Sequence, residues 1–224
     1  MIKDALAKLA DRTDLSAQEA EAVMCEIMDG AATSAQVAGY LMGLRQKGET
    51  VDEIVGSARA MRSRAARVRV GAPIVVDTCG TGGDGAHTFN ISTTAAFVVA
   101  GAGITVAKHG NRSVSSRSGS ADVLSALGVK IDLESNRMVD CIDEVGIGFL
   151  FAPHYHSAMK HCAGPRQEMG IRTILNVLGP LTNPAGATHQ VLGVYEAQKT
   201  EILGRVLLEL GSQHCFVIHG MDGL

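Results

Sequence analysis

A glycine-rich turn near the middle of the chain has the composition of a phosphate-binding site. Residues 77–85 read Asp-Thr-Cys-Gly-Thr-Gly-Gly-Asp-Gly, and they follow an apolar run at 74–76 that predicts a buried strand. Glycine has no Cβ, so the backbone N–H groups of such a turn can approach an anion closely. Ligands of open parallel sheets bind at the carboxyl ends of strands. We therefore predict a phosphate site here; the alternative is a tight turn that needs glycine for its geometry alone.

The turn differs from two widespread phosphate loops. It lacks the Gly-Lys-Ser/Thr sequence of a Walker A loop. The spacing of Gly80, Gly82 and Gly85 can be aligned with the dinucleotide fingerprint, but Asp84 would repel a pyrophosphate that rested directly on the loop. We expect Asp84 to lie beside a cation or a sugar hydroxyl instead.

A helix N-terminus follows the turn and adds donors to it. Residues 95–102 are apolar and predict a buried helix, and Asn90, Ser92 and Thr93 precede it. Free N–H groups and the positive end of the helix dipole at such a position favour an anion.

A second run of donors follows the next predicted strand, at 104–107. Residues 108–116 contain an ammonium group, a guanidinium group, an amide and three hydroxyls. Charge-assisted hydrogen bonds from such groups to phosphate contribute roughly 1.5–3 kcal/mol each. Two such loops at neighbouring strand ends can hold a ligand with two phosphate groups; the alternative is a solvated polar loop. Ser120 is expected to cap the helix that comes next.

The elements that position these loops fall into two groups. The first third of the chain predicts four helices, one over 2–10 and three that begin at the caps Ser16, Ser34 and Thr50. After Arg69, strands and helices alternate, which predicts a mostly parallel sheet. The expected strands are 74–77, 104–107, 147–151, 191–195 and 215–218, and the expected helices are 95–102, 120–127, 134–145, 157–169 and 197–210.

The predicted fold class is α/β, with a small N-terminal helical lobe and a larger domain whose mostly parallel sheet is flanked by helices. The helical lobe is expected to span 1–69 and to be joined by part of 157–185. The α/β domain is expected to span 70–224 and to be incomplete at its C-terminus.

Composition limits the classes of function. Of the 224 residues, 46% are apolar and 19% are charged, which favours a globular core. A net charge of -3 argues against nucleic acid as a partner. The five cysteines are odd in number and form no Cys-x-x-Cys pair, so a zinc or disulfide framework is not expected and a reducing cytoplasm is. The sequence has no signal-peptide pattern and no apolar run long enough to span a membrane.

Five segments together resemble the anthranilate phosphoribosyltransferase family, in the family's order and along the whole chain. They are residues 79–84, 90–93, 108–112, 119–122 and 179–184. The resemblance implies a two-lobed fold shared with pyrimidine nucleoside phosphorylases, and a homodimer formed through the helical lobe. It also implies transfer of phosphoribosyl from 5-phosphoribosyl diphosphate to anthranilate in tryptophan biosynthesis, with Mg²⁺ as the cofactor.

The resemblance also implies roles for individual residues. Ser92 matches a magnesium ligand. The positions that match the donor site are Gly80, Gly83, Asp84, Thr88, Asn90, Ser92, Thr93, Lys108, His109, Gly110, Asn111, Arg112, Ser113, Ser116 and Ser120. The positions that match the anthranilate site are Gly80, Asn111, His156 and Arg166.

The acceptor segment departs from the family pattern at two positions. Tyr155 stands where a histidine is common and Ser157 where a proline is common, so the entry or affinity of anthranilate is expected to differ. The spacing of His154 and His156 could alternatively indicate a metal site. The fork of Arg166 suits the anthranilate carboxylate, whereas Arg172 is expected to be structural.

The expected chemistry requires no covalent intermediate with the enzyme. The aromatic amine is neutral near pH 7 and the sequence shows no convincing nucleophile–base pair, so catalysis is expected to come from positioning and electrostatics. The alternatives are a pyrimidine nucleoside phosphorylase and a non-catalytic ligand-binding relative. The family pattern continues after Leu224 into an Asp-Glu pair that binds magnesium, so we expect the 224-residue chain by itself to bind the donor weakly and to turn over poorly.

Overall fold

The computed structural model describes residues 1–82, 89–113 and 118–221. The chain divides into two compact units. The helical unit comprises Met1–Ala65 and His156–Thr182, and the α/β unit comprises Ala66–Tyr155 and Asn183–Leu224. The helical unit is therefore built from two separate stretches of sequence.

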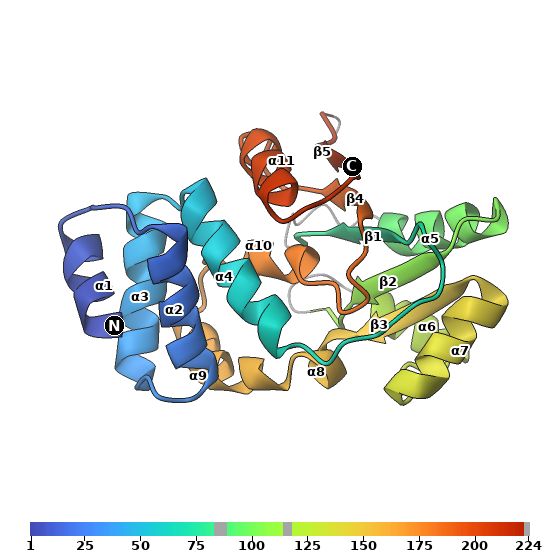
Figure 1. Ribbon diagram of the computed structural model, residues 1–224, viewed down its shortest axis with the longest axis horizontal. Coiled ribbons are helices and arrows are strands. Elements are labelled where there is room, and N and C mark those ends of the chain that lie inside the picture. Colours follow the sequence, from blue (N-terminus) through green and yellow to red (C-terminus); the bar gives the residue numbers. More distant parts are fainter. Residues whose placement is uncertain (83–88, 114–117, 222–224) are drawn as a thin grey trace. The chain divides into compact units, whose positions relative to one another are not determined.

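The helical unit is a bundle of α-helices supplemented by single turns (Figure 1). Helices α2 (Ala17–Met28) and α4 (Val51–Arg64) pack closely, and Gly56 permits this, because a Cβ there would lie 2.1 Å from the carbonyl oxygen of Ala17. Helix α9 (Lys160–Met169) packs against α3 (Ser34–Lys47) and α2. The elements are α1 (Ile2–Ala10), α2 (Ala17–Met28), α3 (Ser34–Lys47), α4 (Val51–Arg64), η1 (Ser157–Met159), α9 (Lys160–Met169), α10 (Leu175–Leu178) and η2 (Gly179–Leu181).

Capping boxes set the start of three of these helices. Ser16 and Thr50 cap α2 and α4 as predicted, each with a glutamate three residues later that completes the box. The predicted cap of α3 was wrong by one residue: Thr33 is the cap, and Ser34 is the first helical residue. Thr33 is the cap because the side chain of Gln36, three residues after it, accepts a hydrogen bond from the Thr33 N–H.

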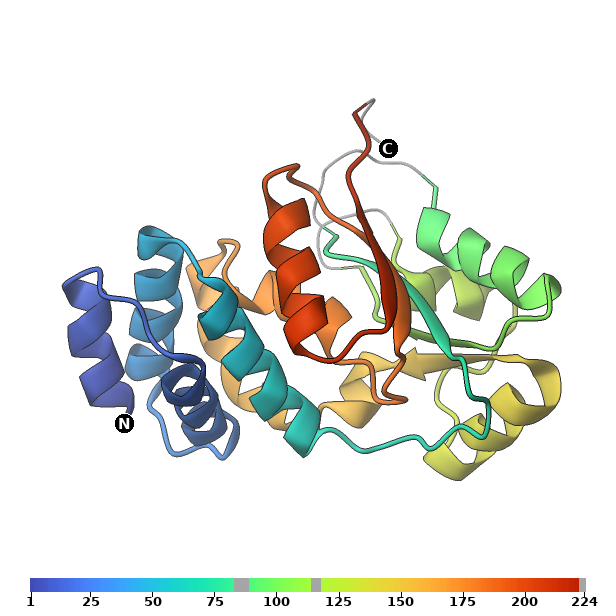
Figure 2. The ribbon, with the colours of Figure 1, turned by 45° about the horizontal axis from the view of Figure 1, so that its top comes forward.

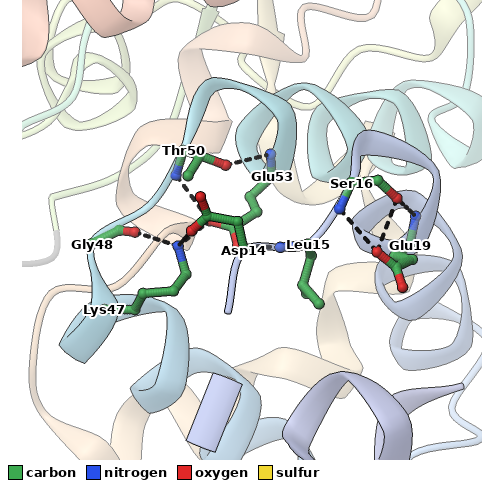
Figure 3. Close-up of polar contacts among 8 residues, drawn as sticks. All are labelled: Asp14, Leu15, Ser16, Glu19, Lys47, Gly48, Thr50 and Glu53. Carbon is green, nitrogen blue, oxygen red and sulfur yellow. Dashed lines mark hydrogen bonds and ion pairs between the residues drawn. The ribbon is translucent and has the colours of Figure 1, made fainter. Parts of the chain in front are cut away.

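A buried glutamate joins the helix ends of this unit (Figure 3). Glu53 is fully buried, and its carboxylate accepts hydrogen bonds from the N–H groups of Leu15 at 3.0 Å and Thr50 at 2.9 Å. The Nζ of Lys47 lies 3.0 Å from the same carboxylate and 2.7 Å from Asp14. One carboxylate thus connects the segment before α2, the end of α3 and the start of α4.

The α/β unit contains a five-stranded sheet in which all strands are parallel, in the order β3-β2-β1-β4-β5. The fold class is therefore as predicted. The elements are β1 (Val76–Gly80), α5 (Ile91–Gly101), β2 (Val106–Gly110), α6 (Ser120–Ala126), α7 (Ser135–Val145), β3 (Ile147–Phe151), α8 (Ala152–Tyr155), β4 (His189–Gly193), α11 (Lys199–Glu209) and β5 (His214–Ile218).

Helices α5 and α11 lie on opposite sides of this sheet (Figure 2). Successive strands from β1 to β3 are added toward one edge of the sheet, and β5 is added to β4 toward the other edge. Because crossovers between parallel strands are right-handed, the connecting helices of these two groups cover opposite faces of the sheet. The helix predicted at 95–102 is present, but the expectation that it is buried was wrong. The helix begins earlier, at Ile91, and its outer face is exposed at Phe97 and Val98.

Most strand boundaries differ from the prediction, although the strand at 147–151 is as expected. The first two strands begin later than their apolar runs and extend through Gly80 and Gly110 into the donor-rich segments. The fourth begins and ends two residues earlier than expected, and the fifth begins one residue earlier, at His214. The extent of a parallel strand depends on its neighbours, and in-register pairing with β4 continues to the Gly80–Gly193 pair.

The other predicted helices differ mainly at their ends. The predicted helix 157–169 is divided into the short turn η1 and α9. Helices α6, α7 and α11 end or begin one or two residues inside the predicted limits. Among the residues described, no helix combines the length and apolar character needed to cross a membrane.

Candidate functional site

A buried lysine joins the middle of β2 to the middle of β1. Lys108 was predicted in a loop, but it lies inside β2, 3% exposed, with His109 also buried beside it. Its Nζ donates to the carbonyl oxygen of Thr78 in β1 at 2.5 Å and to Oγ of Ser92 in α5 at 3.2 Å. Thr78 in turn donates from Oγ1 to the carbonyl oxygen of Ser92 at 2.8 Å. The first turn of α5 is therefore fixed to both strands.

Asp77 is the acidic residue that interacts electrostatically with the buried Lys108. It is fully buried in β1, and Oδ1 accepts the N–H of His109 at 3.1 Å. Burial raises the pKa of Asp77 to about 6, although the nearby Lys108 cation opposes the rise. Burial likewise lowers the pKa of Lys108, and Asp77 partly offsets this effect. No role was assigned to Asp77 from the sequence. The signal that could have identified it is an acidic residue directly after the apolar run 74–76.

The N-terminus of α5 contacts Ser118, two residues after the second donor-rich segment. Asn90 is the N-cap residue of α5, and its Nδ2 donates to Oγ of Ser118 at 3.2 Å and to the Ser118 carbonyl at 3.3 Å. Thr93 is 2% exposed and faces the core of the unit, whereas Ser92 is partly exposed. The two predicted anion loops, 77–85 and 108–116, are joined by a different contact, that of Lys108 with Thr78.

Asp122 organises the segment that follows β2. Its Oδ2 accepts the N–H groups of Ser113 at 2.9 Å and Gly119 at 2.8 Å, and its Oδ1 accepts from Nη1 of Arg112 at 3.0 Å. Ser120 was predicted to cap α6, but Gly119 is the N-cap residue and Ser120 begins the helix. Asn111 accepts the backbone N–H of Arg112 through Oδ1 at 2.7 Å.

Glycines allow close approach in this region. A Cβ on Gly119 would lie 2.4 Å from the N atom of Ser113, and one on Gly110 would lie 2.8 Å from the ring of Phe149. Gly80 ends β1 and is exposed. The predicted donor-site residues Gly83, Asp84, Thr88 and Ser116 lie outside the described residues.

The four residues predicted for the acceptor belong to different units: His156 and Arg166 to the helical unit, Gly80 and Asn111 to the α/β unit. His156 is 6% exposed, and burial lowers its pKa, although the backbone of Thr182 acts in the opposite direction. Arg166 is in the last turn of α9, and burial lowers its pKa, with Cys162 opposing. Arg172 is half-buried after α9.

Tyr155, the first departure from the family pattern, belongs to the α/β unit. It is 3% exposed and packs in an apolar cluster with Val68, Leu150 and Ile142 among others.

The described residues offer one oxygen of the kind that magnesium binds at this position. Ser92 is partly exposed, and its hydroxyl oxygen accepts a hydrogen bond from Lys108. Within the described parts of the chain, no three His, Cys, Asp or Glu side chains gather into a metal site. Mg²⁺ commonly takes most of its ligands from phosphate and water, so a single protein hydroxyl is compatible with it.

The similarity to known proteins covers almost the whole chain. Residues 3–65 match the family described as "Glycosyl transferase family, helical bundle domain", and residues 72–224 match "Glycosyl transferase family, a/b domain". The chain is 64% identical to the anthranilate phosphoribosyltransferase of Anaeromyxobacter dehalogenans, with 100% of this chain and 66% of that protein covered. The chain therefore spans slightly less than two thirds of the length of this curated relative.

Solved structures share the fold. The crystal structure of anthranilate phosphoribosyltransferase from Thermus thermophilus matches with a TM-score of 0.94 and 46% identity, over 99% of this chain and 67% of that one. The Saccharomyces cerevisiae enzyme in complex with PRPP and Mg matches with a TM-score of 0.90 and 29% identity, over 100% of this chain and 66% of that one. These matches, together with the two family domains found in sequence, show that the chain belongs to this glycosyl transferase family.

Proposed function

We propose that the protein transfers the 5-phosphoribosyl group of 5-phosphoribosyl diphosphate to anthranilate, giving N-(5-phosphoribosyl)anthranilate and pyrophosphate in tryptophan biosynthesis. The observation that carries the proposal is that Lys108, the first residue of the second donor-rich segment, contacts Thr78 in the glycine-rich turn and Ser92 at the N-terminus of α5. The curated and solved relatives with this activity support it.

The α/β unit is proposed to hold the donor. The N-terminus of α5 and the segment from Lys108 to Ser113 present amide, hydroxyl and cationic donors, which suit the diphosphate and 5-phosphate groups. Mg²⁺ is proposed as the cofactor, with Ser92 as one ligand, because a bound magnesium ion neutralises charge on the diphosphate.

The acceptor is proposed to bind through Arg166, whose guanidinium fork matches a carboxylate. His156 is proposed to line the path of the aromatic ring, and Asn111 to contact the acceptor. Because burial lowers the pKa of His156, the imidazole is neutral near pH 7 and does not compete with the arginine for the carboxylate.

In the proposed reaction the amine nitrogen of anthranilate forms a bond to C1 of the ribose. The bond from C1 to the pyrophosphate oxygen breaks, pyrophosphate leaves with the bonding electrons, and the nitrogen loses a proton to solvent. The residues of the chain contribute by positioning both substrates and by stabilising the negative charge of the leaving group.

A homodimer formed through the helical unit and a cytoplasmic location are part of the proposal. The resemblance to the family supports the dimer. The five cysteines are all free thiols, which fits a reducing compartment.

The proposal is tested by following the loss of anthranilate fluorescence in the presence of 5-phosphoribosyl diphosphate and Mg²⁺. The full-length protein is used, with any residues that follow position 224 in its natural sequence. Consumption should require the donor, and Arg166→Ala should raise the KM for anthranilate far more than the KM for the donor. Phosphorolysis of thymidine without anthranilate consumption would overturn the proposal.

A further inference from the structure

We propose that Asp122 is a positioning residue for the donor-binding segment that follows β2. Its carboxylate holds the backbone of Ser113 and Gly119 and the guanidinium of Arg112 in the arrangement that receives the phosphates of the donor. The inference rests on the function proposed above and adds a residue to which the resemblance gives no role.

The first argument is that both carboxylate oxygens are used by different parts of the segment. Oδ2 accepts two backbone N–H groups, those of Ser113 at 2.9 Å and Gly119 at 2.8 Å. Oδ1 faces Nη1 of Arg112 at 3.0 Å. One carboxylate therefore fixes a residue on each side of the stretch 114–118 and a cationic side chain at the same time.

The second argument is that helix capping does not explain these contacts. An acidic residue at the third position of a helix commonly accepts the N–H of the cap, which here is Gly119. Ser113 and Arg112 lie nine and ten residues before Asp122, outside the reach of any capping motif.

The third argument is that the backbone of this region is closely packed around the carboxylate. The N–H of Ala121 donates to the carbonyl oxygen of Asn111 at 3.2 Å. A Cβ on Gly119 would lie 2.6 Å from that same oxygen and 2.4 Å from the N atom of Ser113. The start of α6 and the segment after β2 are therefore in direct backbone contact, and the carboxylate holds them together.

The fourth argument concerns charge. The N–H groups of Ser113 and Gly119, followed by Arg112, hold the pKa of Asp122 below its ordinary value, so the group is an anion at neutral pH. The contact uses one of the five N–H donors of the guanidinium, and among the described residues no other partner of the guanidinium is found, so we expect the other donors to serve an incoming phosphate. The Arg112–Asp122 pair is half-exposed and contributes little to stability by itself, so its main consequence is orientation.

The test compares Asp122→Ala and Asp122→Asn in the full-length protein. Donor affinity is measured by calorimetry and as the KM for 5-phosphoribosyl diphosphate. Asp122→Ala is expected to weaken donor binding about ten- to a hundredfold, because charged hydrogen bonds that order the segment are lost. Asp122→Asn keeps one acceptor oxygen but loses the charge that orients Arg112, so an intermediate loss is expected. The KM for anthranilate should stay within about twofold in both variants.

Asp140→Ala is the matched control. Asp140 forms a pair with Arg137 at the same 3.0 Å, but it lies on the exposed side of α7 and has no role in the site. This variant should leave both KM values and the unfolding temperature unchanged.

Wild-type donor affinity in a folded Asp122→Ala protein would overturn the inference. Equal rises in both KM values together with a large loss of thermal stability in both Asp122 variants would also overturn it, because those results describe a purely structural residue. Failure of the proposed function is seen separately: the wild-type protein would then neither bind 5-phosphoribosyl diphosphate nor consume anthranilate.

Discussion

Lys47 in the helical unit and Lys108 in the α/β unit are both withdrawn from solvent, but their surroundings differ. The ammonium of Lys47 contacts two carboxylates, Asp14 and Glu53. Burial alone would lower its pKa, but those two hydrogen bonds outweigh burial and the pKa is raised. The ammonium of Lys108 contacts a carbonyl and a hydroxyl oxygen, and its pKa is lowered because burial dominates.

The difference separates a structural lysine from one that is available to a ligand. The ammonium of Lys47 donates to the carboxylates of Asp14 and Glu53 and to the carbonyl oxygen of Gly48, and these contacts hold helix ends together (Figure 3). The charge of Lys108 is only partly compensated, by Asp77 beneath it, so a further anion near the carboxyl ends of β1 and β2 would be stabilised. A buried lysine whose charge is balanced by carboxylates is therefore structural, whereas one whose charge is only partly balanced can stabilise a bound anion.

The largest effect is expected from Glu53→Ala. The substitution leaves Lys47 without its buried partner and the N–H groups of Leu15 and Thr50 without an acceptor. Removing one member of a buried pair costs about 3–5 kcal/mol, and we expect a loss of that size in the free energy of unfolding, measured by urea denaturation followed by circular dichroism. Asp14→Ala is the control, because Asp14 is 66% exposed in its side chain and should cost about 1 kcal/mol or less. Equal losses in the two variants would contradict the structural role of Glu53.

The next effect concerns turnover and uses the two lysines directly. Lys108→Met is expected to reduce kcat/KM for the donor about a hundredfold or more, because a preorganised positive charge near the developing pyrophosphate is removed. Lys47→Met should instead lower the free energy of unfolding and leave kcat/KM of the folded protein within about threefold. A matching loss of activity in both variants would show that the contrast between the two lysines has no functional meaning.

A smaller effect is expected in the pH dependence of stability. The pKa of Asp77 is about 6 in the folded protein and close to 3.8 in an exposed carboxyl. Between these values the folded state binds the proton and the unfolded state does not, so the contribution of Asp77 to stability falls as pH rises from about 4 to about 6. Asp77→Asn removes this titration and keeps an acceptor for the N–H of His109.

The stability difference between wild type and Asp77→Asn should therefore change by about 2 kcal/mol across that pH range and be constant above it. Denaturant unfolding at a series of pH values measures the difference directly. A difference that did not vary with pH would mean that Asp77 has an ordinary pKa.

Much of the helical unit could be predicted from sequence because its signals are local. A capping box needs residues only three positions apart, so Ser16 and Thr50 were placed correctly from their neighbours. The one-residue error at Ser34 arose because Thr33 and Ser34 are both good caps, and the choice depends on which of them Gln36 contacts.

The parallel arrangement of the sheet could be predicted from sequence, but the limits of most of its strands could not. The alternation of apolar runs and helical segments indicated parallel strands, which the structure confirms. The ends of β1 and β2 were misplaced because the residues after Asp77 and after Ala107 were interpreted as loop. Lys108 remains in its strand since Asp77 partly compensates its charge inside the protein, which a sequence pattern does not reveal.

The sequence by itself determined the family resemblance, the fold class and the order of the donor-rich segments, because these depend on residue types and on spacings within a few positions. Only the tertiary structure decided that Lys108 is buried, that Asn90 meets Ser118, and that Asp122 binds residues nine and ten positions before it. Burial and charge compensation depend on segments distant in sequence that packing brings together, and local propensity contains no information about that packing.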